Sequence, residues 1–92
     1  MEIHEIRRQI DGLDEQILEL LNRRVALALQ IGELKRLQGR PIRVPDREAQ
    51  VLARLSSRTP GPLSPEAVVR IFSRIIEESR SLEGLGSGRE EP

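Results

Sequence analysis

The 92-residue sequence contains no cysteine, which excludes disulfide bonds, thiolate metal sites and cysteine nucleophiles. It contains one histidine, His4, and a single histidine supplies neither a zinc cluster nor the base of a Ser-His-Asp triad. We therefore expect no metal site built from cysteine or histidine. A chain without cysteine also suits a reducing compartment, so we expect a cytoplasmic protein.

Aromatic residues are almost absent as well, because Phe72 is the only one in the chain. Fifteen cationic residues balance fifteen anionic ones, so the chain lacks the net positive field and the stacking platforms that bind nucleic acids. No apolar run reaches even about ten residues, whereas a helix that spans a membrane needs about twenty. We expect a soluble protein that binds neither nucleic acid nor membranes.

A long helical pattern is present at the start of the chain. Between residues 3 and 34, apolar residues alternate at spacings of three and four, and they fill nine of ten positions on one stripe. This apolar seam consists of Ile3, Ile6, Ile10, Leu13, Ile17, Leu20, Leu27, Ile31 and Leu34. Its remaining position holds Arg24, and the sequence predicts that the helix stops at Gly39 and Pro41.

A second, shorter helix is predicted to begin at Pro45 and to end near residues 56–57. Proline fits the first turn of a helix, and the carboxylates of Asp46 and Glu48 favour its positive end. In the segment RPIRVPDRE, Arg47 then places a guanidinium at a helix N-terminus, where free backbone N–H groups also favour an anion.

A third helix is predicted from Ser64 and Pro65 to about Glu83, because serine caps a helix and proline fits its first position. Its inward face is formed by Val68, Phe72, Ile75, Ile76 and Leu82. We expect an all-α domain over residues 1–84, followed by a flexible C-terminal tail or linker over residues 85–92.

The first helix is too long for a compact chain of this size. About 35 residues at ~1.5 Å each span ~52 Å, whereas a compact chain of this length has a radius of gyration near ~12 Å. Much of the seam would therefore be exposed unless a second, antiparallel copy covered it. The sequence predicts three helices per chain, with a very long first helix, in an intertwined antiparallel helical homodimer.

Cationic residues interrupt the apolar pattern of the first helix. Lys35 lies eleven residues after Arg24 and therefore only about 20° away around the helix, with Ala28 and Gly32 leaving space between them. Arg7 lies on the same side but ~25 Å from Arg24 along the helix. Only an antiparallel partner could bring its Arg7 to this pocket, so we predict a site shared between two chains.

The third helix carries a matching irregularity. The stripe that begins at Val68 continues to Ser79 and then Glu83, so that a hydroxyl and a carboxyl occupy positions that should be apolar. Together with the cations, these residues predict a buried pocket for a small dianion, without a nucleophile, a metal or an obvious proton shuttle.

Each residue also has a structural interpretation. A seam arginine such as Arg24 can fix the register of a coiled coil, and the segment 40–48 can be a solvated loop. In that case the chain would be a dimerisation module without enzymatic activity.

Four segments, IRRQIDGLDEQILELLNRR, IGELK, RPIRVPDRE and IIEES, occur in the order and with the spacing of the all-helical chorismate mutase family. The resemblance covers about residues 3–83. It implies an isomerase that converts chorismate to prephenate, towards phenylalanine and tyrosine, without a cofactor. It also implies a homodimer of three-helix chains with two shared active sites.

The resemblance implies roles for the cationic residues. Arg7 resembles the arginine that the partner chain donates, and Arg24 and Arg47 resemble those that grip the substrate carboxylates. Lys35 resembles the lysine that binds the ether oxygen and a carboxylate. These four residues are half of the eight expected substrate contacts.

Four further positions complete the implied site. Glu48 resembles the carboxylate that accepts a hydrogen bond from the ring hydroxyl, and Ser79 resembles a polar contact to a carboxylate. Val44 stands where an aspartate is frequent, so only its backbone N–H could reach the hydroxyl. Glu83 stands near the ether oxygen where the best-known bacterial pattern has glutamine and fungal relatives have glutamate. The resemblance thus makes Lys35, Glu83 and Arg24 the expected catalytic residues.

Two other functions stay open on this fold. Isochorismate-pyruvate lyases share it, and their dianionic substrate would suit the same cations. A regulatory mutase module is the other alternative, because relatives are fused to or associated with the first enzyme of the shikimate pathway or with prephenate dehydratase.

Overall fold

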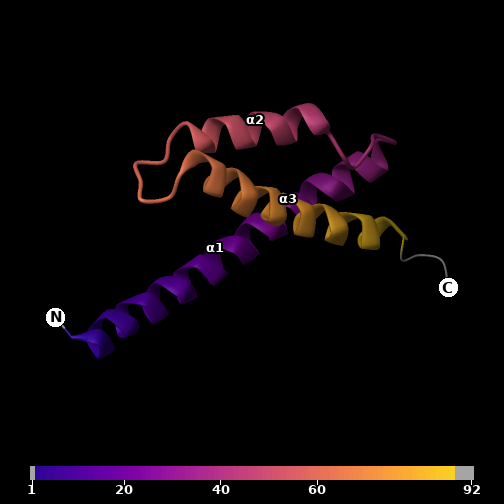
Figure 1. Cartoon of the computed structure of the whole chain (residues 1–92). Coiled ribbons are helices and arrows are strands. Elements are labelled where there is room, and N and C mark those ends of the chain that lie inside the picture. Colours follow the sequence, from indigo (N-terminus) through magenta and orange to yellow (C-terminus); the bar gives the residue numbers. More distant parts are fainter. Residues whose placement is uncertain (1, 89–92) are drawn as a thin grey trace.

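A computed structural model of the chain describes residues 2–88, with side chains described over residues 2–84. It consists of three helices, α1 (Ile3–Leu37), α2 (Pro45–Ser56) and α3 (Pro65–Gly88). The helix α3 packs against both α1 and α2, whereas α1 and α2 do not pack against each other. Figure 1 shows α2 and α3 lying over the second half of α1, while the first half of α1 extends away from them. The predicted all-α class with a long first helix is confirmed.

The helix boundaries follow from local sequence signals. After α1 the backbone turns at Gly39, whose φ of 69° favours glycine, and the N–H of Arg40 donates to the Lys35 carbonyl at 2.8 Å. Pro45 occupies the start of α2 as predicted. At the start of α3, the Ser64 hydroxyl oxygen accepts a hydrogen bond from the N–H of Ala67 at 3.0 Å. The predicted serine cap is therefore present.

The end of α3 differs from the prediction. The helix continues to Gly88 rather than ending near Glu83. The last part of the predicted tail, residues 89–92, lies outside the described residues. The proposed boundary between a domain over residues 1–84 and a tail over residues 85–92 stays a prediction.

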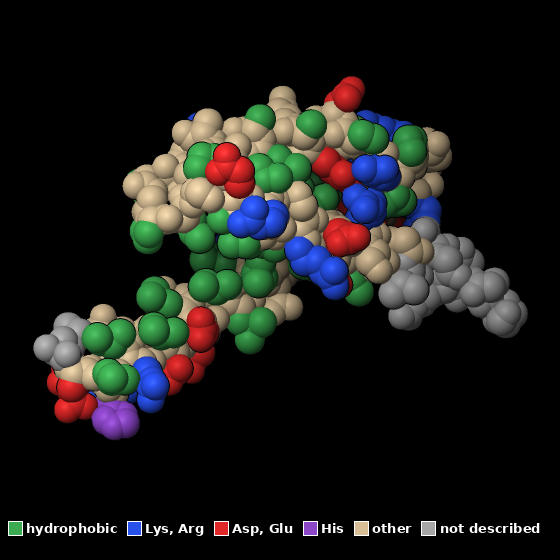
Figure 2. Space-filling view, in the orientation of Figure 1, with side chains coloured by type: hydrophobic (Ala, Val, Ile, Leu, Met, Phe, Trp, Pro, Cys, Tyr) green, Lys and Arg blue, Asp and Glu red, His purple; other side chains and the backbone are tan. Residues whose placement is uncertain are grey.

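Two different faces of α1 carry apolar residues. Leu21, Val25, Ala28 and Gly32 form an inner stripe, all of them at least partly buried, and Leu21 and Val25 share a groove with α3. The apolar seam lies about one residue, or ~100°, away from this stripe. All nine apolar seam residues are exposed in the single chain, at 43% or more of their surface. Figure 2 shows hydrophobic side chains along the protruding half of α1.

The core of the single chain is thin. Val51 and Val68, at 4% and 6% exposed, are the only buried apolar side chains among the described residues, and Leu82, predicted to face inward, is 43% exposed. The radius of gyration is 16.6 Å, against ~12 Å for a compact chain of this length. The accessible surface is 7378 Å², about 2,000 Å² above the value for a folded monomer of this mass. Within residues 2–88, no helix is long and apolar enough to cross a membrane.

Candidate active site

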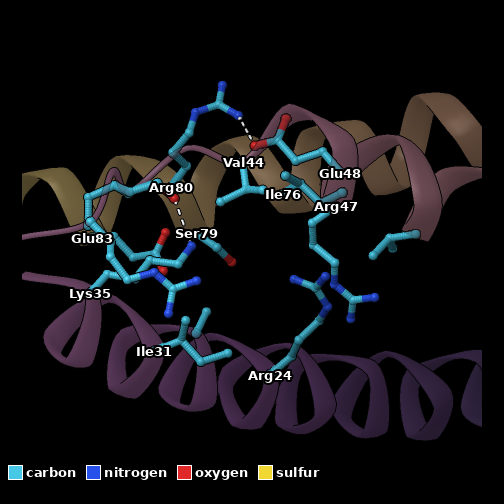
Figure 3. A pocket seen from close by; sticks show the side chains of 14 residues that line it. Arg24, Ile31, Lys35, Val44, Arg47, Glu48, Ile76, Ser79, Arg80 and Glu83 are labelled. Carbon is cyan, nitrogen blue, oxygen red and sulfur yellow. Dashed lines mark hydrogen bonds and ion pairs between the residues drawn. The ribbon is translucent and has the colours of Figure 1, made fainter. Parts of the chain in front are cut away.

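A cavity of about 320 Å³ opens between the second half of α1, the start of α2 and the second half of α3 (Figure 3). Seven of the eight site residues expected from the sequence line it: Arg24, Lys35, Val44, Arg47, Glu48, Ser79 and Glu83. The eighth, Arg7, lies on the exposed first half of α1, outside this cavity. Arg7 and Arg24 are thus separated along α1, as expected from the rise of the helix.

The cavity is strongly cationic although the chain is neutral. Five cationic side chains and two carboxylates line it; the cations are Arg24, Lys35, Arg40, Arg47 and Arg80, and the carboxylates are Glu48 and Glu83. Such a surplus of positive charge in a concave site favours a small anion with more than one negative charge. No group of three or more His, Cys, Asp or Glu side chains within the described part of the chain could hold a metal ion.

Arg24 and Arg47 face each other from different helices. Figure 3 shows Arg24 rising from α1 and Arg47 descending from α2, with their guanidinium ends directed into the same space. Arg47 donates to the side-chain oxygen of Gln50 at 3.1 Å, whereas Arg24 pairs with no carboxylate among the described residues. Two guanidinium groups that face each other repel, so an anion between them would be favoured by both.

Lys35 and Glu83 lie at the other end of the cavity. The Lys35 ammonium donates to the backbone carbonyl of Ile42 at 3.0 Å, which leaves two of its three N–H groups for other acceptors. Burial raises the pKa of Glu83 above its ordinary value of 4.5; Lys35 and Arg80 oppose this rise and Glu48 adds to it. The Glu83 carboxyl is therefore protonated at higher pH than an exposed glutamate.

Gly32 plays a different part from the one expected. The sequence suggests that Ala28 and Gly32 leave room for a ligand, and Ala28 does line the cavity. At Gly32, however, the space is occupied by Glu83, because an added Cβ would lie 3.1 Å from the Glu83 Cγ atom. This glycine makes room for a site residue and not for the ligand.

Ser79 is the buried polar residue that most clearly lacks a partner. It is only 4% exposed, and its hydroxyl oxygen has no hydrogen-bond partner within the described residues. Buried hydroxyl groups are nearly always hydrogen-bonded, so an unpaired one in the wall of a cavity marks a place where a ligand can bind.

Sequence reasoning missed Arg80. Its guanidinium donates to the Glu48 carboxylate at 2.7 Å (Figure 3). Arg80 lies four residues after Ile76 and three before Glu83, both of which also line the cavity, so helical spacing could have placed it there. Charged residues on a helix usually lie on its solvent-exposed face, so charge alone gives no signal for a place in a cavity.

Known proteins resemble this chain in sequence. The sequence profile of the family described as chorismate mutase type II matches residues 6–84. The chain is 44% identical over 86 residues to a bifunctional chorismate mutase/prephenate dehydratase of Aquifex aeolicus, which covers 89% of this chain and 24% of that protein. It is 34% identical to a chorismate mutase of Methanocaldococcus jannaschii, covering 86% of this chain and 81% of that one.

The fold is shared with solved structures. The crystal structure of chorismate mutase from Helicobacter pylori in complex with prephenate matches with a TM-score of 0.85 and 31% identity, covering 98% of this chain and 97% of that one. These findings, with the match over residues 6–84, show that the chain belongs to the chorismate mutase type II family. It spans about a quarter of the length of the bifunctional relative from Aquifex aeolicus.

Proposed function

We propose that this chain is an isomerase that converts chorismate to prephenate. The observation that carries the proposal is a single cationic cavity lined by seven of the eight residues expected for this activity. Membership of the family and the prephenate complex of the Helicobacter pylori relative support it. A cytoplasmic location and an association with a shikimate-pathway enzyme stay predictions from the sequence.

The reaction explains why the site needs no nucleophile. A Claisen rearrangement breaks one C–O bond and forms one C–C bond within the same molecule, and no proton or electron is exchanged with the protein. Arg24 and Arg47 would hold the two substrate carboxylates and so restrict the substrate to a reactive conformation. Ser79 would donate its unpaired hydroxyl proton to a carboxylate.

The developing charge on the ether oxygen is the second target of the site. Lys35 has N–H groups available, and a protonated Glu83 would supply another donor beside it. A preorganised donor at such an oxygen typically contributes ~3 to 4 kcal/mol to the lowering of the barrier. Glu48, at the far wall, would accept a hydrogen bond from the ring hydroxyl, with the Val44 backbone nearby.

We further propose that two chains form an intertwined antiparallel homodimer. The exposed seam and the surface excess of about 2,000 Å² support it, since obligate dimers bury roughly 2,000 to 5,000 Å². The antiparallel arrangement would bring the partner's Arg7 to the cavity and complete the set of site residues.

One assay tests the activity. The purified wild type and two variants, Arg24→Met and Arg23→Met, are each incubated with chorismate, and the prephenate formed is measured. Arg23 is a neighbouring exposed arginine outside the cavity, so its variant is the control. We expect prephenate from the wild type and the Arg23 variant and a loss of at least about 100-fold in Arg24→Met. Formation of salicylate and pyruvate from isochorismate, with no prephenate from chorismate, would contradict the proposal in favour of a lyase.

A further inference from the structure

Arg80 and Glu48 form an ion pair between α3 and the first turn of α2. The Arg80 guanidinium nitrogen lies 2.7 Å from the Glu48 Oε2 atom, and the side chains are 31% and 20% exposed. Arg80 directly follows the buried Ser79 on α3, so its backbone is held by a well-packed part of the helix. The pair is therefore less screened by solvent than the exposed ion pairs of Arg74 with Glu77 and Glu78 on the same helix.

The second oxygen of Glu48 also faces a cation. The Arg43 guanidinium lies 3.5 Å from the Glu48 Oε1 atom, but the Arg43 side chain is 61% exposed. The longer distance and greater exposure make this contact weaker than the one with Arg80. Arg80 is thus the main determinant of where the Glu48 carboxylate lies.

The pair separates two cavities. Glu48, Ile76 and Arg80 line the candidate active site and also a second cavity of about 320 Å³ between α2 and α3. Without Arg80, Glu48 could rotate towards Arg43 and the second cavity, because nothing else among the described residues pairs with its Oε2 atom. The carboxylate would then leave the wall of the active site.

We propose that Arg80 is a positioning residue for the reaction: it acts through Glu48, holding that carboxylate in the orientation in which it accepts a hydrogen bond from the substrate's hydroxyl group. The inference rests on the proposed function. An ionised carboxylate has only acceptors, so a fixed Glu48 selects a ligand that presents a hydroxyl donor at this place.

A double-mutant cycle distinguishes positioning from direct contact with the substrate. Arg80→Met, Glu48→Gln and the double variant are assayed with chorismate, with Arg70→Met as the control on the exposed face of α3. We expect Arg80→Met to raise KM by about 5- to 20-fold with kcat within about threefold, since a hydrogen bond to a charged group is lost in substrate and transition state alike. In the Glu48→Gln background, Arg80→Met should add less than about twofold.

Conservative variants keep the test independent of folding. Arg80→Gln retains an N–H donor for Glu48 and Arg80→Lys retains the charge, so each should recover part of the KM of the wild type even if Arg80→Met unfolds. Multiplicative effects in the double variant, a lowered KM, or conservative variants no better than Arg80→Met would overturn the inference. If the wild type is active and Arg80→Met has the same KM, the inference alone is contradicted. If the wild type forms no prephenate, the proposed function is contradicted and, with it, the inference.

Discussion

Glu83 of α3 lies directly against Gly32 of α1. A Cβ atom on Gly32 would lie 3.1 Å from the Cγ atom and 3.3 Å from the Oε2 atom of Glu83. This close approach of α3 to α1 lies at the end of the cavity that Glu83 and Lys35 line. The position of the Glu83 carboxyl therefore depends on the absence of a side chain at residue 32.

Gly32→Ala tests this dependence. Alanine favours a helix over glycine by about 1 kcal/mol, which offsets the crowding against Glu83, so we expect a melting temperature close to that of the wild type. Activity should fall by about tenfold or more, because a shift of a few tenths of an ångström misplaces the donor. Prephenate formation and thermal melts measure the two effects.

Gly12→Ala is the matched control on the same helix. A Cβ at Gly12 would meet no atom within 4 Å. We expect this variant to gain stability through helix propensity and to keep wild-type activity. A Gly32→Ala protein as active as Gly12→Ala would show that Glu83 needs no fixed position.

Mixing two inactive variants tests the shared site. Arg7 lies ~25 Å from Arg24 along α1, so in a dimer each site would take its Arg7 from one chain and its Lys35 from the other. A dimer of Arg7→Ala chains and a dimer of Lys35→Ala chains should therefore each lose most activity. Refolding the two chains together should restore activity, since one of the two sites in each heterodimer then contains both wild-type residues. Mass spectrometry verifies the heterodimer, and verified heterodimers without activity would contradict the inter-chain assignment.

Replacing Arg24 should separate stability from function. Arg24 is half-buried in the seam and has no carboxylate partner among the described residues, so its charge is costly to enclose. Arg24→Leu completes the apolar seam, and we expect an equal or higher melting temperature without ligand while catalysis collapses. A clear loss of thermal stability would instead favour a structural role in setting the helix register.

The pH dependence of catalysis tests the donor role of Glu83. Burial raises the pKa of Glu83 above 4.5, and only the protonated carboxyl can donate to the ether oxygen. We therefore expect kcat/KM to fall as pH rises through this pKa, and Glu83→Gln to flatten that limb of the profile. If kcat/KM of Glu83→Gln falls with rising pH just as that of the wild type does, Glu83 is not the donor and Lys35 acts alone.

The same shift makes a prediction for folding. Because the folded state holds the Glu83 proton more tightly than the unfolded state, its stabilising contribution is present below pH 4.5 and is lost as pH rises through the raised pKa. Glu83→Gln should therefore gain stability relative to the wild type as pH increases above 4.5, with no such gain below it. Thermal melts across this range measure the difference.

Most of the helical architecture was predictable because its signals are local. Pro45 and Ser64 act on the turn in which they lie, and helical spacing alone placed Lys35 on the same face of α1 as Arg24. The end of α3 was missed because glycines cost a helix only about 1 kcal/mol each, while the next proline is Pro92. A glycine-rich segment therefore permits a helix end without enforcing one.

The parts that escaped prediction depend on contacts between helices. Apolar spacing on α1 fits two stripes that are offset by one residue, the inner stripe with Gly32 and the apolar seam with Leu34. The sequence does not say which of the two packs on α3. In the structure Gly32 contacts Glu83, whereas Leu34 is exposed. Likewise, an arginine on a helix surface pairs with whichever carboxylate the neighbouring helix presents, so the contact of Arg80 with Glu48 emerged only from the packing of α3 on α2.

Because α1 and α2 each pack on α3 and not on each other, the cavity has two sides that are joined only through a third helix and a short connecting loop. A ligand held between Arg24 and Arg47 would supply the missing bridge between those sides. Binding would then act as an additional packing element, and it should slow amide hydrogen exchange in α2 more than in the protruding half of α1. In this fold the substrate would complete the interior of the protein as well as occupy its site.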